Sequence, residues 1–311
     1  VRADITPQVA RIDAHRMDTA GVNRLSYCGS VLHTRSAEPL ASRNPMQIGA
    51  ELYGHAGIES EVEVISLMLE TLAEVKADHE LSLDLGHVDI FRGLMEMAAL
   101  SDAQQDEYRD ILERKALPEL ESFLNQITDE QVREWLGQLP RLTGGVDILE
   151  RARQVLSGAP AVVSQAILYL QQLADQLQAR YQQLDLYFDL SELRGYNYHT
   201  GVVFAAYVPT HGQAVAKGGR YDGIGRDFGR ARAATGFSCD LKILSELSGE
   251  TVQVDDVILA PAGTDESLLQ AIRDLRAQGK RIVQALPGAA SDNSCSQQLL
   301  QQDGQWVVAA R

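Results

Sequence analysis

Hydrophobic residues recur at helical spacing in two segments near the start of the chain, and each segment predicts a helix. Thr6–Thr19 has Pro7 as its second residue, and proline is favoured in the first helical turn. Ile58–Val75 is the stronger pattern, because it places Val62, Ile65, Leu69 and Leu72 on one face. Weaker patterns predict three more helices, at Ile90–Leu100, Leu241–Leu247 and Asp265–Gln278.

Alternating or short continuous apolar runs predict the strands of a sheet. They are expected at Arg24–Leu32, Met46–Tyr53, Leu81–Leu85, Leu184–Leu190, Val202–Val208, Gln213–Lys217 and Ala233–Asp240. The loop-like stretch Ser36–Pro45 would fold the first two strands into an antiparallel pair. Between residues 101 and 180 the chain is rich in Gln, Glu, Leu and Ala with a helical period, which predicts a helical insertion between strands.

A second pattern follows Thr251–Asp256, which has the composition of a linker. Strands are expected at Val257–Ala260, Arg281–Ala285 and Trp306–Ala309, with a helix after the first, and this order predicts a small parallel α/β domain. The expected organisation is therefore an α+β core over residues 1–250 and an α/β domain over residues 251–311.

Charge and cysteine content narrow the classes of function. The net charge of -15 and the pI near 4.9 argue against a broad nucleic-acid surface, which needs a basic face. Three cysteines without paired or metal-like spacing fit a reducing cytoplasm. We see no membrane-length apolar run, signal peptide or metal motif. The abrupt opening at Val1 indicates a fragment whose first elements are missing; the alternative is a natural start after processing.

Two short motifs carry the candidate chemistry, Leu193–Gly201 and Lys217–Ile224. Both combine Gly, Tyr and Arg on or beside a predicted strand. Glycine lets the backbone approach a ligand, and the guanidinium groups of Arg194 and Arg220 suit a carboxylate or a phosphate. The motifs therefore favour a small-molecule pocket, with a glycine-bulged hairpin sheet as the alternative.

The motif series resembles the class II aminoacyl-tRNA synthetases in their histidyl version. Arg2–Thr6 is similar to the Arg-Pro-Glu-Gly-Thr segment of that family, and Arg24–Gly54 to its motif 2 hairpin and the next strand. The two short motifs resemble its histidine signatures, and Ala234–Leu244 stands where motif 3 belongs. The resemblance covers residues 1 to about 247, is weak in the helical insertion, and implies an antiparallel sheet flanked by helices.

Departures from that family fall on its nucleotide-binding positions. The motif 2 arginine that holds the ATP α-phosphate is replaced by His33, and the motif 3 arginine by Ile243. Asp240 adds a carboxylate where ATP would lie. Nucleotidyl transfer depends on charge stabilisation, so the resemblance implies that amino-acid activation is lost. An alignment slip of one residue would bring Lys242 to the arginine position.

The amino-acid half of the site is largely kept. Gln47 and Glu51 match residues that hold the histidine ammonium and imidazole, and Tyr221 matches a tyrosine that lines the pocket. Asp4 replaces a glutamate, and His199 stands where a second tyrosine is usual. The histidine-binding residues that the resemblance implies are Asp4, Gln47, Glu51, Arg194, Tyr198, His199 and Tyr221. The alternative is a buried polar network without a ligand.

This combination is similar to a paralogous family, the regulatory subunits of ATP phosphoribosyltransferase. Arg2–Arg11 and Ala234–Lys242 look characteristic of it, and the C-terminal piece looks like a reduced anticodon-binding domain. The resemblance implies a cytoplasmic, non-catalytic protein without a cofactor that activates a short-form catalytic subunit and mediates feedback by histidine. It also implies self-association as a dimer, a hetero-octamer with the catalytic subunit, and no nucleic-acid or membrane partner.

Two alternatives remain at this point. The chain could be a fragment of an active histidyl-tRNA synthetase, which the replacements at His33, Asp240 and Ile243 oppose. It could also be a synthetase-like module that modifies or binds another protein, but such relatives usually keep the ATP arginines.

Overall fold

The computed structural model describes residues 2–17, 20–35, 42–75, 80–249, 256–289 and 295–311. The chain divides into two compact units, Val1–Gly249 and Glu250–Arg311. The expected linker lies outside the described residues except for Asp256, as does the part of the expected loop from residue 36 to 41.

The first unit is built on an eight-stranded sheet with the order β1-β2-β8-β7-β6-β3-β5-β4. Its pairs are antiparallel except for the parallel pair of β3 and β5. The strands are β1 (Asn23–Ser30), β2 (Met46–Tyr53), β3 (Ser82–His87), β4 (Thr143–Gly144), β5 (Asp185–Asp189), β6 (Val202–Tyr207), β7 (Ala216–Arg220) and β8 (Ala234–Asp240).

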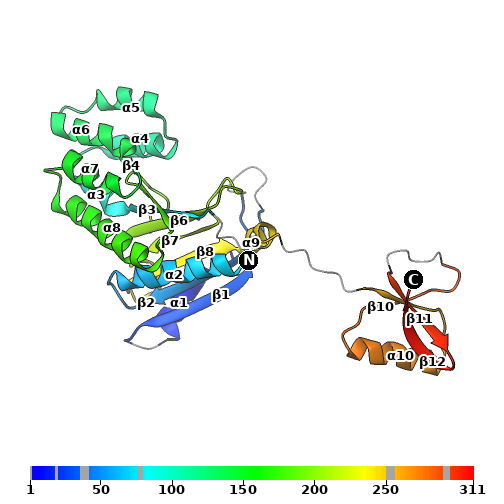
Figure 1. Ribbon diagram of the computed structural model, residues 1–311. Helices are drawn as coiled ribbons and strands as arrows, with labels where there is room; N and C mark the ends of the chain where they lie inside the picture. Colours follow the sequence, from blue (N-terminus) through cyan, green and yellow to red (C-terminus); the bar gives the residue numbers. More distant parts are fainter. Residues whose placement is uncertain (1, 18–19, 36–41, 76–79, 250–255, 290–294) are drawn as a thin grey trace. The chain divides into compact units, whose positions relative to one another are not determined.

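Helices pack against this sheet, with α2 and α8 lying along it in Figure 1. The helices are α1 (Thr6–His15), α2 (Glu59–Glu74), α3 (Val88–Ala98), α4 (Asp102–Glu113), α5 (Leu117–Leu124), α6 (Glu130–Gln138), α7 (Asp147–Val155), α8 (Ala161–Arg180) and α9 (Leu241–Leu247), with 3-10 turns η1 (Leu139–Arg141) and η2 (Ile224–Phe228). One large core joins the sheet, α2, α3 and the helical insertion, and includes the fully buried Ile65, Phe91, Tyr108 and Leu170. Burial of these apolar faces is the main stabilising contribution.

The helical insertion is confirmed as α4 to α8, with α4, α5 and α6 grouped together in Figure 1. The first helix of the insertion begins at a residue that the local sequence specifies, because Ser101 and Gln104 form a capping box there. The insertion also contributes β4, which pairs with β5 at the edge of the sheet. The insertion is therefore continuous with the core of the first unit.

Two predicted elements of the first unit are wrong at an end by three or more residues. Helix α1 ends at His15 rather than Thr19, and residues 18 and 19 lie outside the described part. The strand expected at Gln213–Lys217 is shifted to Ala216–Arg220. Glycine usually marks a break in a strand, but here it is required, because a Cβ on Gly218 would lie 2.1 Å from the carbonyl oxygen of Gly236.

The second unit is a four-stranded sheet with the order β10-β9-β11-β12 and one helix. Its elements are β9 (Ile258–Ala260), α10 (Glu266–Ala277), β10 (Ile282–Gln284), β11 (Gln297–Gln302) and β12 (Gln305–Ala310). The predicted parallel arrangement is confirmed for β9 and β10, but not for β12, which pairs antiparallel with β11. The missed strand β11 is mostly glutamine, so its sequence lacks the apolar alternation that predicts a strand.

Candidate functional site

All seven predicted binding residues line one cavity of about 760 Å³ in the first unit. This volume lies within the usual range for small-molecule sites. The cavity floor is a row across four neighbouring strands, in which Glu51 pairs with Gly236, Gly236 with Gly219, and Gly219 with Val203. The two glycines make room for neighbouring side chains, since Glu51 fills the space of a Cβ at Gly236 and His199 that at Gly219.

Glu51 is the centre of the polar wall. The residue is 3% exposed, and its carboxylate accepts hydrogen bonds from the hydroxyl groups of Thr6 and Tyr27, both at 3.1 Å, and from that of Tyr221. Burial raises the pKa of Glu51 to about 7, while the hydrogen bonds from Tyr221, Tyr27 and Thr6 oppose that rise. The carboxyl group therefore titrates near neutral pH.

Thr6, Tyr27 and Tyr53 were missed at the sequence level. Tyr53 lies 3.4 Å from the hydroxyl of Tyr221, and the two rings meet edge to face. Tyr27 and Tyr53 occur on the paired strands β1 and β2, where alternation places side chains on a common face. That alternation is the signal that could have found them.

Asp4 and Gln47 form a second polar pair in the same cavity. The side-chain amide of Gln47 donates to Asp4 Oδ1 at 2.8 Å, and its oxygen accepts from the backbone N–H of Ile5 at 3.0 Å. Asp4 also accepts from the backbone N–H of Thr6. These contacts hold the segment before α1 against β2.

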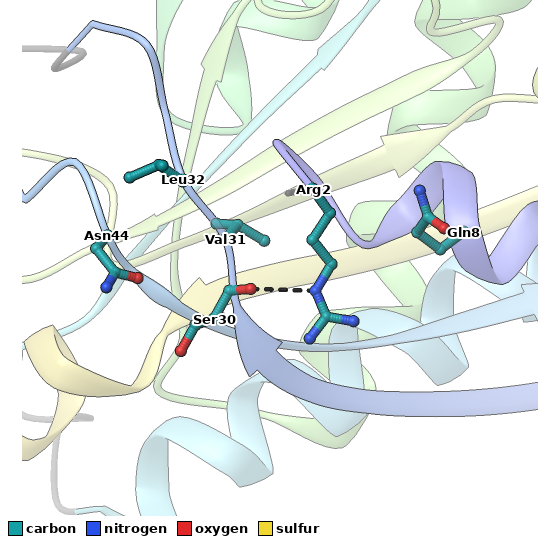
Figure 2. Close-up of a pocket in the computed structure, with 6 residues that line it drawn as sticks. All are labelled: Arg2, Gln8, Ser30, Val31, Leu32 and Asn44. Atoms are coloured by element: carbon teal, nitrogen blue, oxygen red, sulfur yellow. Dashed lines mark hydrogen bonds between the residues drawn. The ribbon is translucent and has the colours of Figure 1, made fainter.

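Arg2 anchors the same segment to the end of β1. Its Nε donates to the carbonyl oxygen of Ser30 at 3.1 Å, as Figure 2 shows, and its own carbonyl accepts from Leu32. Arg2 lies beside Gly29, where a Cβ would come within 2.3 Å of the guanidinium. The hollow around Arg2, about 550 Å³, contains none of the seven predicted residues.

His199 and Tyr198 line the cavity from the turn between β5 and β6, not from a strand. The His199 ring is buried, and desolvation lowers its pKa to about 4, so the imidazole is neutral. Its Nδ1 lies 3.0 Å from the carbonyl oxygen of Arg220. A carbonyl only accepts, so Nδ1 carries the proton and Nε2 is the acceptor. Tyr198 packs on this ring and is 53% exposed.

The arginines of the two short motifs, Arg194 and Arg220, lie in different places. Arg194 lines the cavity, and its guanidinium contacts Glu192 at 2.5 Å and the hydroxyl of Tyr207. Arg220 does not line the cavity, so its interpretation as a ligand-binding fork is wrong. Strand alternation turns its side chain to the other face of β7, where Nε pairs with the fully buried Glu61 of α2 at 2.5 Å.

The positions that the synthetases use for ATP lie in this same cavity. His33, Asp240, Lys242 and Ile243 are among its lining residues. The Asp240 carboxylate caps α9, accepting from the backbone N–H groups of Lys242 at 3.1 Å and Met46 at 3.0 Å. The Lys242 ammonium donates to the carbonyl oxygen of Asn44. Both charged side chains are thus already engaged in local contacts.

Two further searches cover the described residues alone. No helix among them is both long and apolar enough to pass through a bilayer. Within the same ranges, no group of three His, Cys, Asp or Glu side chains could hold a metal ion.

Comparison with known proteins identifies the family of the chain. The family described as histidyl-tRNA synthetase matches residues 1–244, and the family described as the ATP phosphoribosyltransferase subunit HisZ C-terminal domain matches residues 255–309. The ATP phosphoribosyltransferase regulatory subunit of Azotobacter vinelandii is 53% identical over 99% of this chain and 78% of its own length.

Two solved structures share the fold. A protein from Bacillus halodurans, described as an ATP phosphoribosyltransferase regulatory subunit/histidyl-tRNA synthetase, matches with a TM-score of 0.77 and 27% identity over 94% of this chain and 75% of its own. A chain of the ATP phosphoribosyl transferase (HisG:HisZ) complex from Thermotoga maritima matches with a TM-score of 0.58 and 17% identity over 77% and 80%. The chain therefore belongs to the ATP phosphoribosyltransferase regulatory subunit family, built on the histidyl-tRNA synthetase fold.

Proposed function

We propose that this chain is a non-catalytic subunit that senses histidine for ATP phosphoribosyltransferase. The observation that carries the proposal is the division of the cavity. Its amino-acid half keeps Asp4, Gln47, Glu51 and Tyr221 in one hydrogen-bonded wall, while its nucleotide half has lost both phosphate-binding arginines.

The polar groups of the cavity suit the three functional groups of histidine. Asp4 and Gln47 offer acceptors to the α-ammonium group. Glu51 and the Nε2 acceptor of His199 suit the imidazole N–H groups. Arg194 would bind the carboxylate, which requires it to share its guanidinium with Glu192.

Loss of adenylation is part of the proposal. Replacement of two arginines by His33 and Ile243 removes charge-assisted bonds to phosphate. Lys242 would have to leave the Asn44 carbonyl to compensate. An assay of histidine-dependent pyrophosphate exchange with ATP tests this directly. Pyrophosphate exchange well above background would instead favour the hypothesis of an active histidyl-tRNA synthetase fragment.

The partner is the short-form catalytic subunit, which joins ATP to phosphoribosyl pyrophosphate in the first step of histidine biosynthesis. Support comes from the name of the Azotobacter relative and from the Thermotoga chain, which is part of a complex. We place the protein in the cytoplasm as a dimer within a hetero-octamer. Histidine would inhibit by binding one state of the assembly more tightly than the other.

Calorimetric titration with histidine tests the sensor role, first with the chain alone and then with the catalytic subunit. Gln47→Ala should lower the affinity by about tenfold, because it removes the amide that fixes Asp4. Gln172→Ala, an exposed change on α8, is the matched control and should bind as the wild type does. Failure of the wild type to bind histidine in either setting would overturn the sensor role.

A further inference from the structure

The turn segment between β5 and β6 has a second contact face. One face presents Arg194, Tyr198 and His199 to the cavity. On the other, the ring of Tyr196 packs edge to face on Phe91 of α3, with ring centroids 5.1 Å apart and an interplanar angle of 83°. The cavity wall and a helix contact are therefore carried by one short stretch of backbone.

Two guanidinium groups hold the Tyr196 ring. Arg92 of α3 lies 5.4 Å and Arg109 of α4 lies 5.5 Å from its centroid, within the range of cation–π attraction. Arg92 also donates to the carbonyl oxygen of His199 at 3.3 Å. The Nε of Arg109 is buried without a hydrogen-bond partner among the described residues, while its Nη2 pairs with Asp106 at 2.9 Å and its guanidinium faces the ring.

An aromatic series continues from this point into the insertion. Phe91 stacks on Tyr108 of α4 with centroids 5.9 Å apart, and Tyr108 stacks on Phe123 of α5 at 5.2 Å. The Tyr108 hydroxyl donates to the carbonyl oxygen of Leu136 in α6 at 2.7 Å. The rings of Phe91, Tyr108 and Phe123 are at most 1% exposed and closely packed. A displacement of Tyr196 would therefore displace them as well.

The insertion also holds the other end of the turn segment. Lys115, between α4 and α5, pairs with Asp189 at the end of β5 at 3.2 Å. Asp189 is buried and accepts from the N–H and hydroxyl of Ser191. Arg194 thus lies between two points, Asp189 and Tyr196, that residues of the insertion contact.

We infer that the helical insertion is the element that responds to occupancy of the cavity, through Tyr196 and its contact with Arg109. This inference rests on the proposed binding of histidine. A ligand that contacts Arg194, Tyr198 and His199 orders the turn segment, which strengthens the Tyr196 contacts and stabilises α4 and α5. Linkage is reciprocal, so if the ligand strengthens the Tyr196 contacts by some factor, loss of those contacts must weaken ligand binding by that factor.

The experiment combines histidine titration with hydrogen exchange, on the protein assembled with its catalytic subunit. Histidine should slow exchange in α4 and α5 by about threefold or more. Tyr196→Leu and Arg109→Gln should each weaken histidine binding by about fivefold and abolish that slowing. Tyr196→Phe keeps the ring and should bind as the wild type does. Arg114→Gln is the control, since Arg114 directly follows α4 as its C-cap but pairs with Asp110 and Glu119.

The outcomes separate the two proposals. If the wild type fails to bind histidine, the sensor role falls and this inference falls with it. If the wild type binds but exchange in α4 and α5 does not change, or the Tyr196→Leu and Arg109→Gln variants bind normally, only the coupling through the insertion is overturned. Equal losses in the Arg114→Gln control would show a general effect of helix α4 and would also overturn it.

Discussion

Replacement of Glu51 by glutamine should stabilise the folded protein increasingly as pH rises. The side chain is 3% exposed, and burial raises its pKa from 4.5 to about 7. Below pH 4.5 both the folded and the unfolded chain hold the proton, so the carboxyl group costs nothing. As pH rises through this interval, the unfolded chain ionises first, and the free energy of unfolding falls until the folded pKa is passed.

The pKa interval sets the magnitude of this effect. At about 1.4 kcal/mol per pKa unit, the buried carboxyl group costs about 3 kcal/mol above pH 7. Glu51→Gln removes the ionisable group, so its stability relative to the wild type should rise by about that amount between pH 4.5 and 8. The hydrogen bonds from Thr6, Tyr27 and Tyr221 to the ionised carboxylate are already part of this figure, because they oppose the rise of the pKa.

Urea denaturation of both proteins at several pH values between 4.5 and 8 measures the difference. Glu74→Gln, an exposed change at the end of α2, is the control for loss of a carboxylate. The reasoning is refuted if the relative stability of Glu51→Gln stays flat or falls with pH. That result would mean that the hydroxyl donors stabilise the ionised form more than burial opposes it. The histidine affinity of Glu51→Gln should be about tenfold lower than that of the wild type at pH 8. The substitution would then weaken binding under the conditions in which it stabilises the fold.

Three further changes test the surroundings of Glu51. Gly236→Ala should abolish histidine binding and destabilise the fold, because its Cβ would lie 1.5 Å from the Glu51 carboxylate. Gly212→Ala is the control and should do neither, since a Cβ there meets nothing within 4 Å. Normal calorimetric binding by Gly236→Ala would contradict this prediction. Arg220→Met should lower the free energy of unfolding, measured in urea, by about 3–5 kcal/mol, because the charge of Glu61 is left buried without its ion-pair partner. The folded variant should keep its histidine affinity. An unchanged free energy of unfolding would disprove the prediction. Tyr221→Phe removes a hydrogen bond that lowers the pKa of Glu51, so the pH midpoint of histidine binding should move upward, and a downward move would count against the assignment.

Local sequence was sufficient for elements whose signal is periodic or chemically sharp. The apolar face of α2 and the capping box of α4 specify helices without knowledge of the rest of the chain. The motif resemblance was also sufficient to bring Asp4, Gln47, Glu51 and Tyr221 into one cavity. It could not find β11, since a glutamine-rich strand is specified by pairing with β9 and β12 rather than by its own pattern.

The direction of each side chain was decided only by the tertiary structure. Arg194 and Arg220 are alike in sequence context, yet one lines the cavity and the other pairs with Glu61 beneath the sheet. A strand turns successive side chains to opposite faces, so an error of a few residues in the bounds of β7 hides which face Arg220 takes.

The sequence by itself determined the family, the elements of the two units and the choice of candidate binding residues, because motifs and periodicity are local properties of the chain. Only the tertiary structure decided which hydroxyl groups surround Glu51, which charges are already paired, and that Tyr196 meets Arg109 of the insertion. These are contacts between residues far apart in sequence. They depend on how the sheet and helices pack, and the local pattern of the chain does not say which distant residues will meet.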